Sequence, residues 1–328
     1  MINVLPLFLF SDIWAQMTSI TPLALAYTAP LLIIALGGLY SERSGVVNVG
    51  LEGLLGVGAF SAAIFISKTS PTMGMTAVWL GLLIGALSGA LFSLLHAFAS
   101  VTMRANQIIS GTAINILSMA LTVYVARLLN GSSNVQILDS FVKSSVPLLS
   151  QIPIIGPLLF QKAYTTTFVV LGIVAFTWYL IYKTPFGLRL RACGENPHAA
   201  DSMGINVARM RYIGVMISGA LAGLGGAIII TTYSREFSQL TYNGLGFLAL
   251  AALIFGKWDP RGVLGASVFF GLATTVASIS KVYESFQQVP NIFLNTFPYV
   301  VTLVGLVLFS KNAAGPRAAG EPYDKGKR

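Results

Sequence analysis

Eight apolar segments, each about 20 residues long, follow one another along this sequence, and none contains more than one charged residue. Within lipid, only helices and closed barrels satisfy every backbone polar group, and about 20 helical residues cross the hydrocarbon core. The chain is therefore expected to be an all-α polytopic membrane protein. The segments are 21–39, 46–67, 76–99, 107–129, 164–182, 212–231, 262–280 and 291–310.

The composition agrees with lipid as the main solvent. Only 9% of the residues are charged and 55% are hydrophobic, whereas a soluble domain carries about 25% charged residues. Weaker apolar segments at 3–16, 147–160 and 245–256 leave the expected number of transmembrane helices at about 8–10. Residues 1–310 are expected to form one transmembrane domain. Residues 311–328, rich in Gly, Pro and charge, predict a disordered cytoplasmic tail.

The distribution of Lys and Arg orients the chain in the membrane. When the loop 183–211 is placed in the cytoplasm and 245–256 is counted as a span, six of the 20 basic residues fall outside. These six are Lys68, Arg127, Lys143, Lys162, Arg235 and Lys281. The excess of positive charge inside is the bias expected of a membrane protein, and the N-terminus then lies outside. The same bias explains the net charge of +9, so no nucleic-acid partner is expected.

Two stretches far apart in the sequence resemble each other. Residues 37–51 and 225–245 each contain a glycine pair, then a Tyr-Ser cluster with charged neighbours, then an Asn and a Gly-Leu helix start. In this topology the first copy lies inside and the second outside. That arrangement is an inverted internal repeat, whose interface holds the substrate site in many transporters. Chance similarity between two Gly-rich helix ends is the alternative.

The loop 183–211 contains the signals of a short helix outside the membrane. Asn196 is suited to the N-cap, Pro197 to the first helical position, and Gly204 to the left-handed conformation that ends a helix. Such a helix has nothing of its own to bury against, so it is expected to dock a cytoplasmic partner. A helix that lies on the bilayer surface is the alternative, although Ala residues and Asp201 are not typical of a lipid-binding face.

This loop resembles the coupling loop of ATP-binding-cassette (ABC) importer permeases. Its residues 187–205, together with 38–53 and 105–115, resemble bacterial nucleoside permeases in particular, whose wider group includes ribose and branched-chain amino-acid permeases. The likeness covers most of residues 20–310. By this resemblance the residues that couple to the ATPase are Glu195, Asn196, Pro197, Ala199, Ala200, Asp201 and Gly204.

The resemblance implies a permease subunit that translocates nucleosides across a bacterial inner membrane. It also implies three partners: a cytoplasmic ABC ATPase, a second related permease, and an extracellular substrate-binding lipoprotein. A permease of the same class for simple sugars or branched-chain amino acids is one alternative. A stand-alone secondary transporter is another, and it would need an ion-coupling site within the membrane.

Nothing in the sequence predicts an enzyme. The Gly-x-x-x-x-Gly-Lys-Ser/Thr motif that cradles phosphates is absent from the sequence, so another subunit is expected to hydrolyse ATP. Cys193 is the only cysteine, which excludes an intrachain disulfide and any site built from several thiolates. No metal or cofactor is expected.

Polar side chains within the predicted spans can offer hydrogen bonds to an uncharged ligand. As a set at helix starts they are expected to line the substrate pathway, with interhelical hydrogen bonding as the alternative for each. They are Asn48, Asn106, Gln107, Ser110, Asn115 and Asn243. Glu52 is the only acid within a predicted span. It is expected to pair with Arg43 or Arg104 at the inner boundary, with a place in the pathway as the alternative.

Gly81, Gly85 and Gly89 stand four residues apart in one span, and Gly219 and Gly223 do so in another. Residues spaced by four lie on one helical face, so each stripe is expected to let a second helix approach closely.

Overall fold

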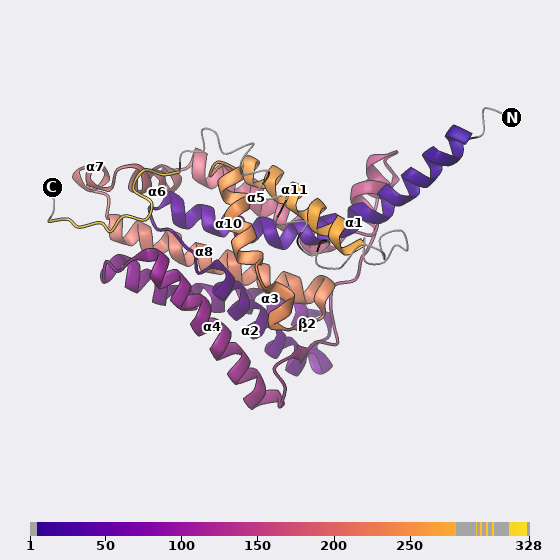
Figure 1. Ribbon diagram of the computed structural model, residues 1–328, viewed down its shortest axis with the longest axis horizontal. Coiled ribbons are helices and arrows are strands. Elements are labelled where there is room, and N and C mark those ends of the chain that lie inside the picture. The colour runs from indigo at the N-terminus through magenta and orange to yellow at the C-terminus, as the bar shows by residue number, and fades with distance from the viewer. Residues whose placement is uncertain are drawn as a thin grey trace.

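The computed structural model describes residues 5–279 and 315–326, together with the isolated positions 293, 296, 300 and 304. Seven described helices are long and apolar enough to cross a membrane, which confirms a polytopic all-α protein (Figure 1). These helices are α1 (Leu5–Arg43), α2 (Leu51–Met73), α3 (Met75–Ala97), α4 (Gln107–Asn130), α5 (Thr165–Lys183), α8 (Val207–Ile229) and α11 (Pro260–Ile279).

Shorter elements join them. The short α-helices are α6 (Pro185–Glu195), α7 (Pro197–Ser202), α9 (Gln239–Tyr242) and α10 (Leu245–Phe255). The π-helical segments are η1 (Phe98–Thr102), η3 (Gly156–Phe160) and η4 (Ile230–Ser234), and η2 (Leu149–Gln151) is a 3₁₀ helix. Strands β1 (Val135–Gln136) and β2 (Glu236–Phe237) pair antiparallel, with Val135 opposite Phe237.

The weaker apolar segments differ in outcome. Segment 245–256 contains the short apolar helix α10, as its length predicted. The two weaker candidates at 3–16 and 147–160 do not form separate spans among the described residues. Described residues from 5 onward continue without a break into α1, and 147–160 contains only the short η2 and η3. The span expected at 291–310 lies outside the described residues apart from four isolated positions.

The two glycine stripes bring α3 and α8 into backbone contact. A Cβ added at Gly223 would lie 2.2 Å from the carbonyl oxygen of Gly85, and one added at Gly89 would lie 2.2 Å from that of Gly219. Small residues permit such approach in membranes, where dispersion contacts replace the hydrophobic effect between helices. The predicted close packing is confirmed, and α8 also packs against α1 and α2 at the centre of the molecule.

Helix α4 lies at the margin of this bundle (Figure 1). It packs mainly against α2, and only 22% of its most apolar stretch is buried, compared with 67% for the span that contains α8. Large apolar side chains such as Ile116 and Leu128 are about 70% exposed. These faces of α4 are therefore available to lipid or to another membrane subunit.

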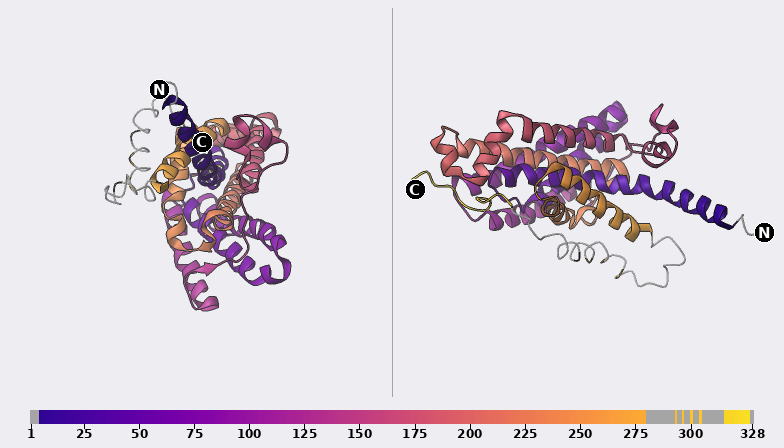
Figure 2. Two further views of the ribbon diagram at one scale, coloured as in Figure 1. Left: turned by 90° about the vertical axis from the view of Figure 1, so that its right-hand side faces the viewer. Right: turned by 90° about the horizontal axis from the view of Figure 1, so that it is seen from above.

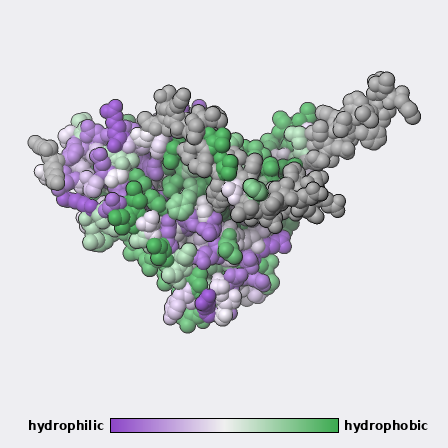
Figure 3. All heavy atoms as spheres, in the orientation of Figure 1, coloured by the Kyte–Doolittle hydropathy of each residue, from purple (hydrophilic) through white to green (hydrophobic). Residues whose placement is uncertain are grey.

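The loops gather at two ends of the molecule. One end holds α6, α7 and the C-terminal segment 315–326, whereas α1 begins at the opposite end (Figure 2). Hydrophilic residues are concentrated around α6 and α7, and apolar residues cover much of the surface next to them (Figure 3). The distribution fits a bundle that crosses a bilayer with α6 and α7 outside the hydrocarbon core.

The segment 315–326 packs against the rest of the protein, so the prediction of a disordered tail was wrong for these residues. Pro316 and Ala318 are buried, and the Ala318 amide donates to the Gly194 carbonyl at 2.9 Å. Composition alone predicted disorder because the segment has little apolar surface. Hydrogen bonds, ion pairs and the packing of its Tyr323 ring hold it against other elements.

Candidate functional site

The predicted short helix in the loop 183–211 is present as α7. Asn196 is its N-cap and accepts a hydrogen bond from the Ala199 amide at 3.0 Å, while Pro197 occupies the first turn. Gly204 has φ +80°, a conformation that costs glycine little. The helix α6 precedes it and is capped by Thr184, which accepts from the Gly187 amide at 3.2 Å. The loop therefore forms a platform of two short helices.

One face of this platform points outward and the other is packed. Ala199 is exposed, whereas Ala200 is 4% exposed and belongs to the hydrophobic core. The expectation that α7 has nothing to bury against was therefore wrong, and Ala200 cannot contact a partner as Ala199 can. Met203 is 82% exposed and Leu188 on α6 is 62% exposed. These apolar side chains were not among the predicted coupling residues, although exposed Met and Leu at a polar surface are typical of interaction sites.

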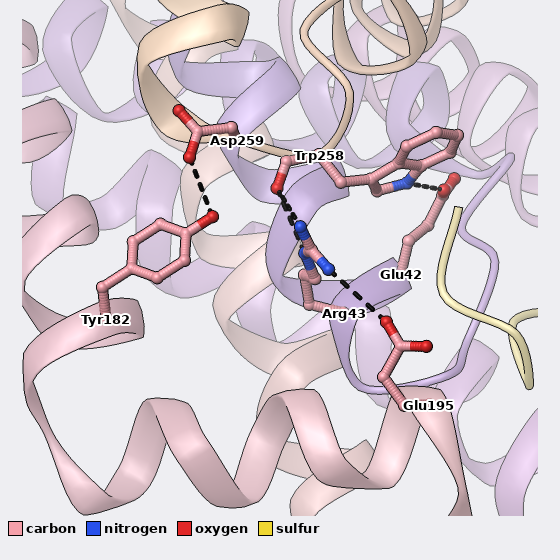
Figure 4. A network of polar contacts seen from close by, with 6 residues as sticks. All are labelled: Glu42, Arg43, Tyr182, Glu195, Trp258 and Asp259. Carbon is pink, nitrogen blue, oxygen red and sulfur yellow. Dashed lines mark hydrogen bonds and ion pairs between the residues drawn. The ribbon is translucent and has the colours of Figure 1, made fainter. Parts of the chain in front are cut away.

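A polar network fixes α6 to the end of α1 (Figure 4). Arg43 at the end of α1 donates to the Trp258 carbonyl at 2.8 Å and lies 3.7 Å from Glu195. The Trp258 indole N–H donates to Glu42 at 2.5 Å. Glu195, one of the predicted coupling residues, thereby links the platform to α1 and to the turn between α10 and α11.

The C-terminal segment 315–326 also contacts the platform, through α7. Lys325 lies 3.4 Å from Asp201 of α7, and the Tyr323 ring contacts the His198 ring with centroids 5.1 Å apart. Asp324 forms an ion pair at 2.7 Å with Arg104, just before α4. The segment thus connects α7 with the start of α4.

Most of the predicted pathway residues hold helices together. Asn48 is fully buried and donates to Ser218 at 2.9 Å, while Gln107 accepts from the Val47 amide at 2.7 Å. Ser110 contacts His96 at 2.9 Å, and Asn106 is the N-cap of α4. Asn48, Gln107 and Ser110 thus join different elements, as the interhelical alternative predicted, whereas Asn106 accepts from two amides of its own helix.

The remaining two predicted residues, Asn115 and Asn243, line a pocket between α2, α4 and the α9–α10 region. The pocket has a volume of about 310 Å³. Other polar and aromatic side chains in its wall were not predicted as pathway residues. They include Thr112, Gln239, Tyr242 and Phe247. Gln239, Tyr242 and Phe247 carry no periodic signal in the sequence, because α9 and α10 are short and lie almost two hundred residues from α2.

Glu52 also lines this pocket, and its expected ion pair is absent from the described residues. Arg43 is bound to the Trp258 carbonyl and to Glu195, and Arg104 is paired with Asp324. The Glu52 carboxylate instead lies against the backbone N–H groups of Gly244, Gly246 and Phe247 at the start of α10. A helix N-terminus carries partial positive charge and unsatisfied N–H groups, so it stabilises a carboxylate without a cation.

Comparisons with known proteins agree with these features. Residues 22–309 match the family described as branched-chain amino acid transport system / permease component. The chain is 46% identical over 318 residues to the guanosine ABC transporter permease protein NupQ of Bacillus subtilis (strain 168), covering 97% of this chain and 100% of that relative.

Two further relatives extend the comparison. The chain is 44% identical to the nucleoside ABC transporter permease protein NupC of Lactococcus lactis subsp. cremoris (strain MG1363), over 92% of this chain and 96% of the relative. It is 25% identical to the guanosine ABC transporter permease protein NupP of Bacillus subtilis (strain 168), over 74% of this chain and 69% of the relative. The family match and the two closer relatives each cover most of the sequence, and the chain therefore belongs to this family of ABC transporter permeases.

Proposed function

We propose that this chain is a permease subunit of an ABC importer that moves nucleosides into a bacterial cell. The observation that carries the proposal is the 46% identity, over 97% of the chain, to a permease named for guanosine transport. A second relative at 44% identity is named for nucleosides in general. The seven apolar helices place the subunit in a membrane, which in bacteria would be the inner membrane.

The platform of α6 and α7 is the proposed docking site for a separate cytoplasmic ATPase. It presents Ala199, Met203 and Leu188 outward, and it is anchored to α1 through Glu195 and Arg43. Movement of a docked partner would reach the bundle through these contacts. Ser202 and Gly204 are also exposed, which leaves room for close approach.

A second, related permease is the proposed partner within the membrane. Bacillus subtilis has two permeases named for guanosine transport, NupQ and NupP, and this chain is more similar to the first. The poorly buried helix α4 offers apolar surface for such a subunit. An extracellular substrate-binding lipoprotein would deliver the nucleoside to the opposite end of the pair.

The docking role is tested by charge substitution on the two faces of α7. Ala199→Glu should leave the protein at its normal level in the membrane but reduce ATPase co-purification and nucleoside uptake by about tenfold, because one charge must be desolvated in the contact. Ala200→Glu should lower the protein level itself, because that side chain is buried. Ser133→Glu, on an exposed loop at the other end, is the control. Full uptake and ATPase binding by Ala199→Glu would refute the docking site.

Branched-chain amino acids are the second candidate substrate class, since the family description names them. Competition in an uptake assay separates the two classes. Excess unlabelled guanosine or uridine should abolish uptake of a labelled nucleoside, while leucine and ribose should not. Transport of leucine or ribose with no transport of nucleosides would refute the proposed substrate while leaving the importer class intact.

A further inference from the structure

Two helices begin at the same point inside the bundle. α2 starts at Leu51 and α10 starts at Leu245. They touch so closely that a Cβ added at Gly246 would lie 2.5 Å from the backbone nitrogen of Glu52. Gly246 is the second residue of α10 and Glu52 is the second residue of α2. Equivalent positions of the two similar stretches in the sequence are therefore in contact.

The surrounding contacts are reciprocal. Gly38, near the end of α1, packs 3.1 Å from Leu253 of α10, measured from an added Cβ. Gly226, near the end of α8, packs 2.9 Å from the backbone nitrogen of Ala59 in α2 by the same measure. Leu253 and Ala59 occupy the ninth position of their helices. One glycine of each pair thus packs against the helix of the other copy, as a two-fold axis through the contact of α2 with α10 requires.

The pocket beside this contact contains polar atoms without partners. Among the described residues, Glu52 Oε2 and Gln239 Nε2 are buried and make no hydrogen bond, and the Tyr242 hydroxyl lies beside Thr122. Tyr242 is only 5% exposed. An unsatisfied buried polar group costs about 1–3 kcal/mol, so such a set is stable when a ligand or water completes it. The aromatic ring of Phe247, 51% exposed, forms part of the same wall.

Lipid is a poor occupant for this pocket. A carboxylate in a transmembrane segment is costly and faces the protein interior or an aqueous cavity almost without exception. Thr112 and Asn115 of α4 line the same space as Glu52, and Asn115 also ties α4 to the start of α2 through the Gly53 amide and the Val49 carbonyl. A volume of about 310 Å³ suits a small organic ligand at the lower end of the usual range.

We infer that this pocket, on the two-fold axis between the repeats, is a nucleoside-binding subsite of the translocation pathway. The inference rests on the proposed function. The Glu52 carboxylate accepts hydrogen bonds from ligand O–H or N–H groups, the Gln239 amide donates, and the Phe247 ring stacks on the base. A neutral nucleoside supplies donors, acceptors and an aromatic face without bringing a charge to the membrane interior.

The test uses the complete transporter, with its ATPase and second permease, in proteoliposomes supplied with the substrate-binding protein. Glu52→Gln keeps the size of the side chain but removes the carboxylate. It should reduce the nucleoside uptake rate about tenfold or more, the effect of losing one charge-assisted hydrogen bond. ATPase co-purification and the thermal stability of the complex should stay close to wild type. Glu236→Gln is the matched control, since Glu236 lies in β2 and is not part of the pocket wall.

Phe247→Leu is a second variant, which keeps an apolar side chain on an exposed position and removes the stacking surface. It should reduce uptake with assembly intact, and it decides the matter if Glu52→Gln fails to assemble. Competition by 2′-deoxynucleosides and by free bases shows whether ribose or base donates to Glu52. Wild-type uptake by both assembled variants would overturn the subsite. Absence of nucleoside uptake by the wild-type transporter would instead refute the proposed function.

Discussion

The contact between α3 and α8 supports a quantitative prediction for Gly223→Ala. The added Cβ would lie 2.2 Å from the Gly85 carbonyl oxygen, 1.2 Å short of the 3.4 Å at which ordinary contact begins. The atoms nearest to the added Cβ, the Gly85 carbonyl oxygen and the Gly89 Cα at 3.0 Å, both belong to the backbone of α3. No side chain can therefore turn away to make room. Two helices must therefore move apart, and overpacking of this kind costs about 1–3 kcal/mol.

Gly172→Ala is the matched control. Gly172 lies within α5, and a Cβ added there would meet nothing within 4 Å. Both substitutions improve helix propensity by about 1 kcal/mol, so the difference between the two variants isolates the overpacking. At about 2–4 °C per kcal/mol, Gly223→Ala should melt roughly 2–12 °C below Gly172→Ala in a thermal-shift assay of the purified permease. Equal melting temperatures would refute the backbone contact between α3 and α8.

Three further predictions concern the ends of the molecule. Single cysteines at the exposed Ser202 and the partly exposed Ser133 should react with an impermeant maleimide from the cytoplasm and from outside, respectively, and labelling of both from one side would contradict the topology. Burial raises the pKa of the Cys193 thiol to about 11 from 9.0, so the folded protein favours the neutral thiol. The resulting contribution to stability is complete below pH 9 and is lost as the pH rises through 11. Because maleimide reacts with the thiolate, labelling of the native protein at pH 8 should be at least about tenfold slower than labelling of the unfolded protein. Deletion of 315–328 removes the 2.9 Å hydrogen bond from the buried Arg211 to the Glu321 carbonyl, which should destabilise the purified protein by about 1–3 kcal/mol; an unchanged melting temperature would show that the segment adds no stability.

Local chemistry was readable from the sequence where its partners lie within a few residues. Asn196, Pro197 and Gly204 define α7 because a cap and a terminating glycine act on the adjacent turn. The glycine stripes of α3 and α8 were equally readable, because spacing by four fixes one helical face. The spans followed from length and hydropathy, which depend only on the segment itself.

Predictions failed where the partner is distant in sequence. Glu52 was assigned an arginine because a carboxylate in a membrane needs compensation, but backbone N–H groups of α10 supply it. Asn48 and Gln107 were assigned to the pathway as polar residues at helix starts, yet their partners Ser218 and Val47 make them structural. Polarity alone does not reveal the direction in which a side chain points. The disordered tail failed for the same reason, since ion pairs to α7 and to Arg104 order a segment of low hydrophobicity.

The position of Trp258 gives the protein an optical reporter of its own. The indole is 9% exposed and bonded to Glu42, and its backbone carbonyl binds the arginine that also contacts the platform (Figure 4). Displacement of α6 relative to α1 would change the polarity around this ring, and the emission wavelength of tryptophan follows the polarity of its surroundings. The chain has 4 Trp, so a version with the other three replaced by Phe would report nucleotide-driven motion in real time without an attached dye.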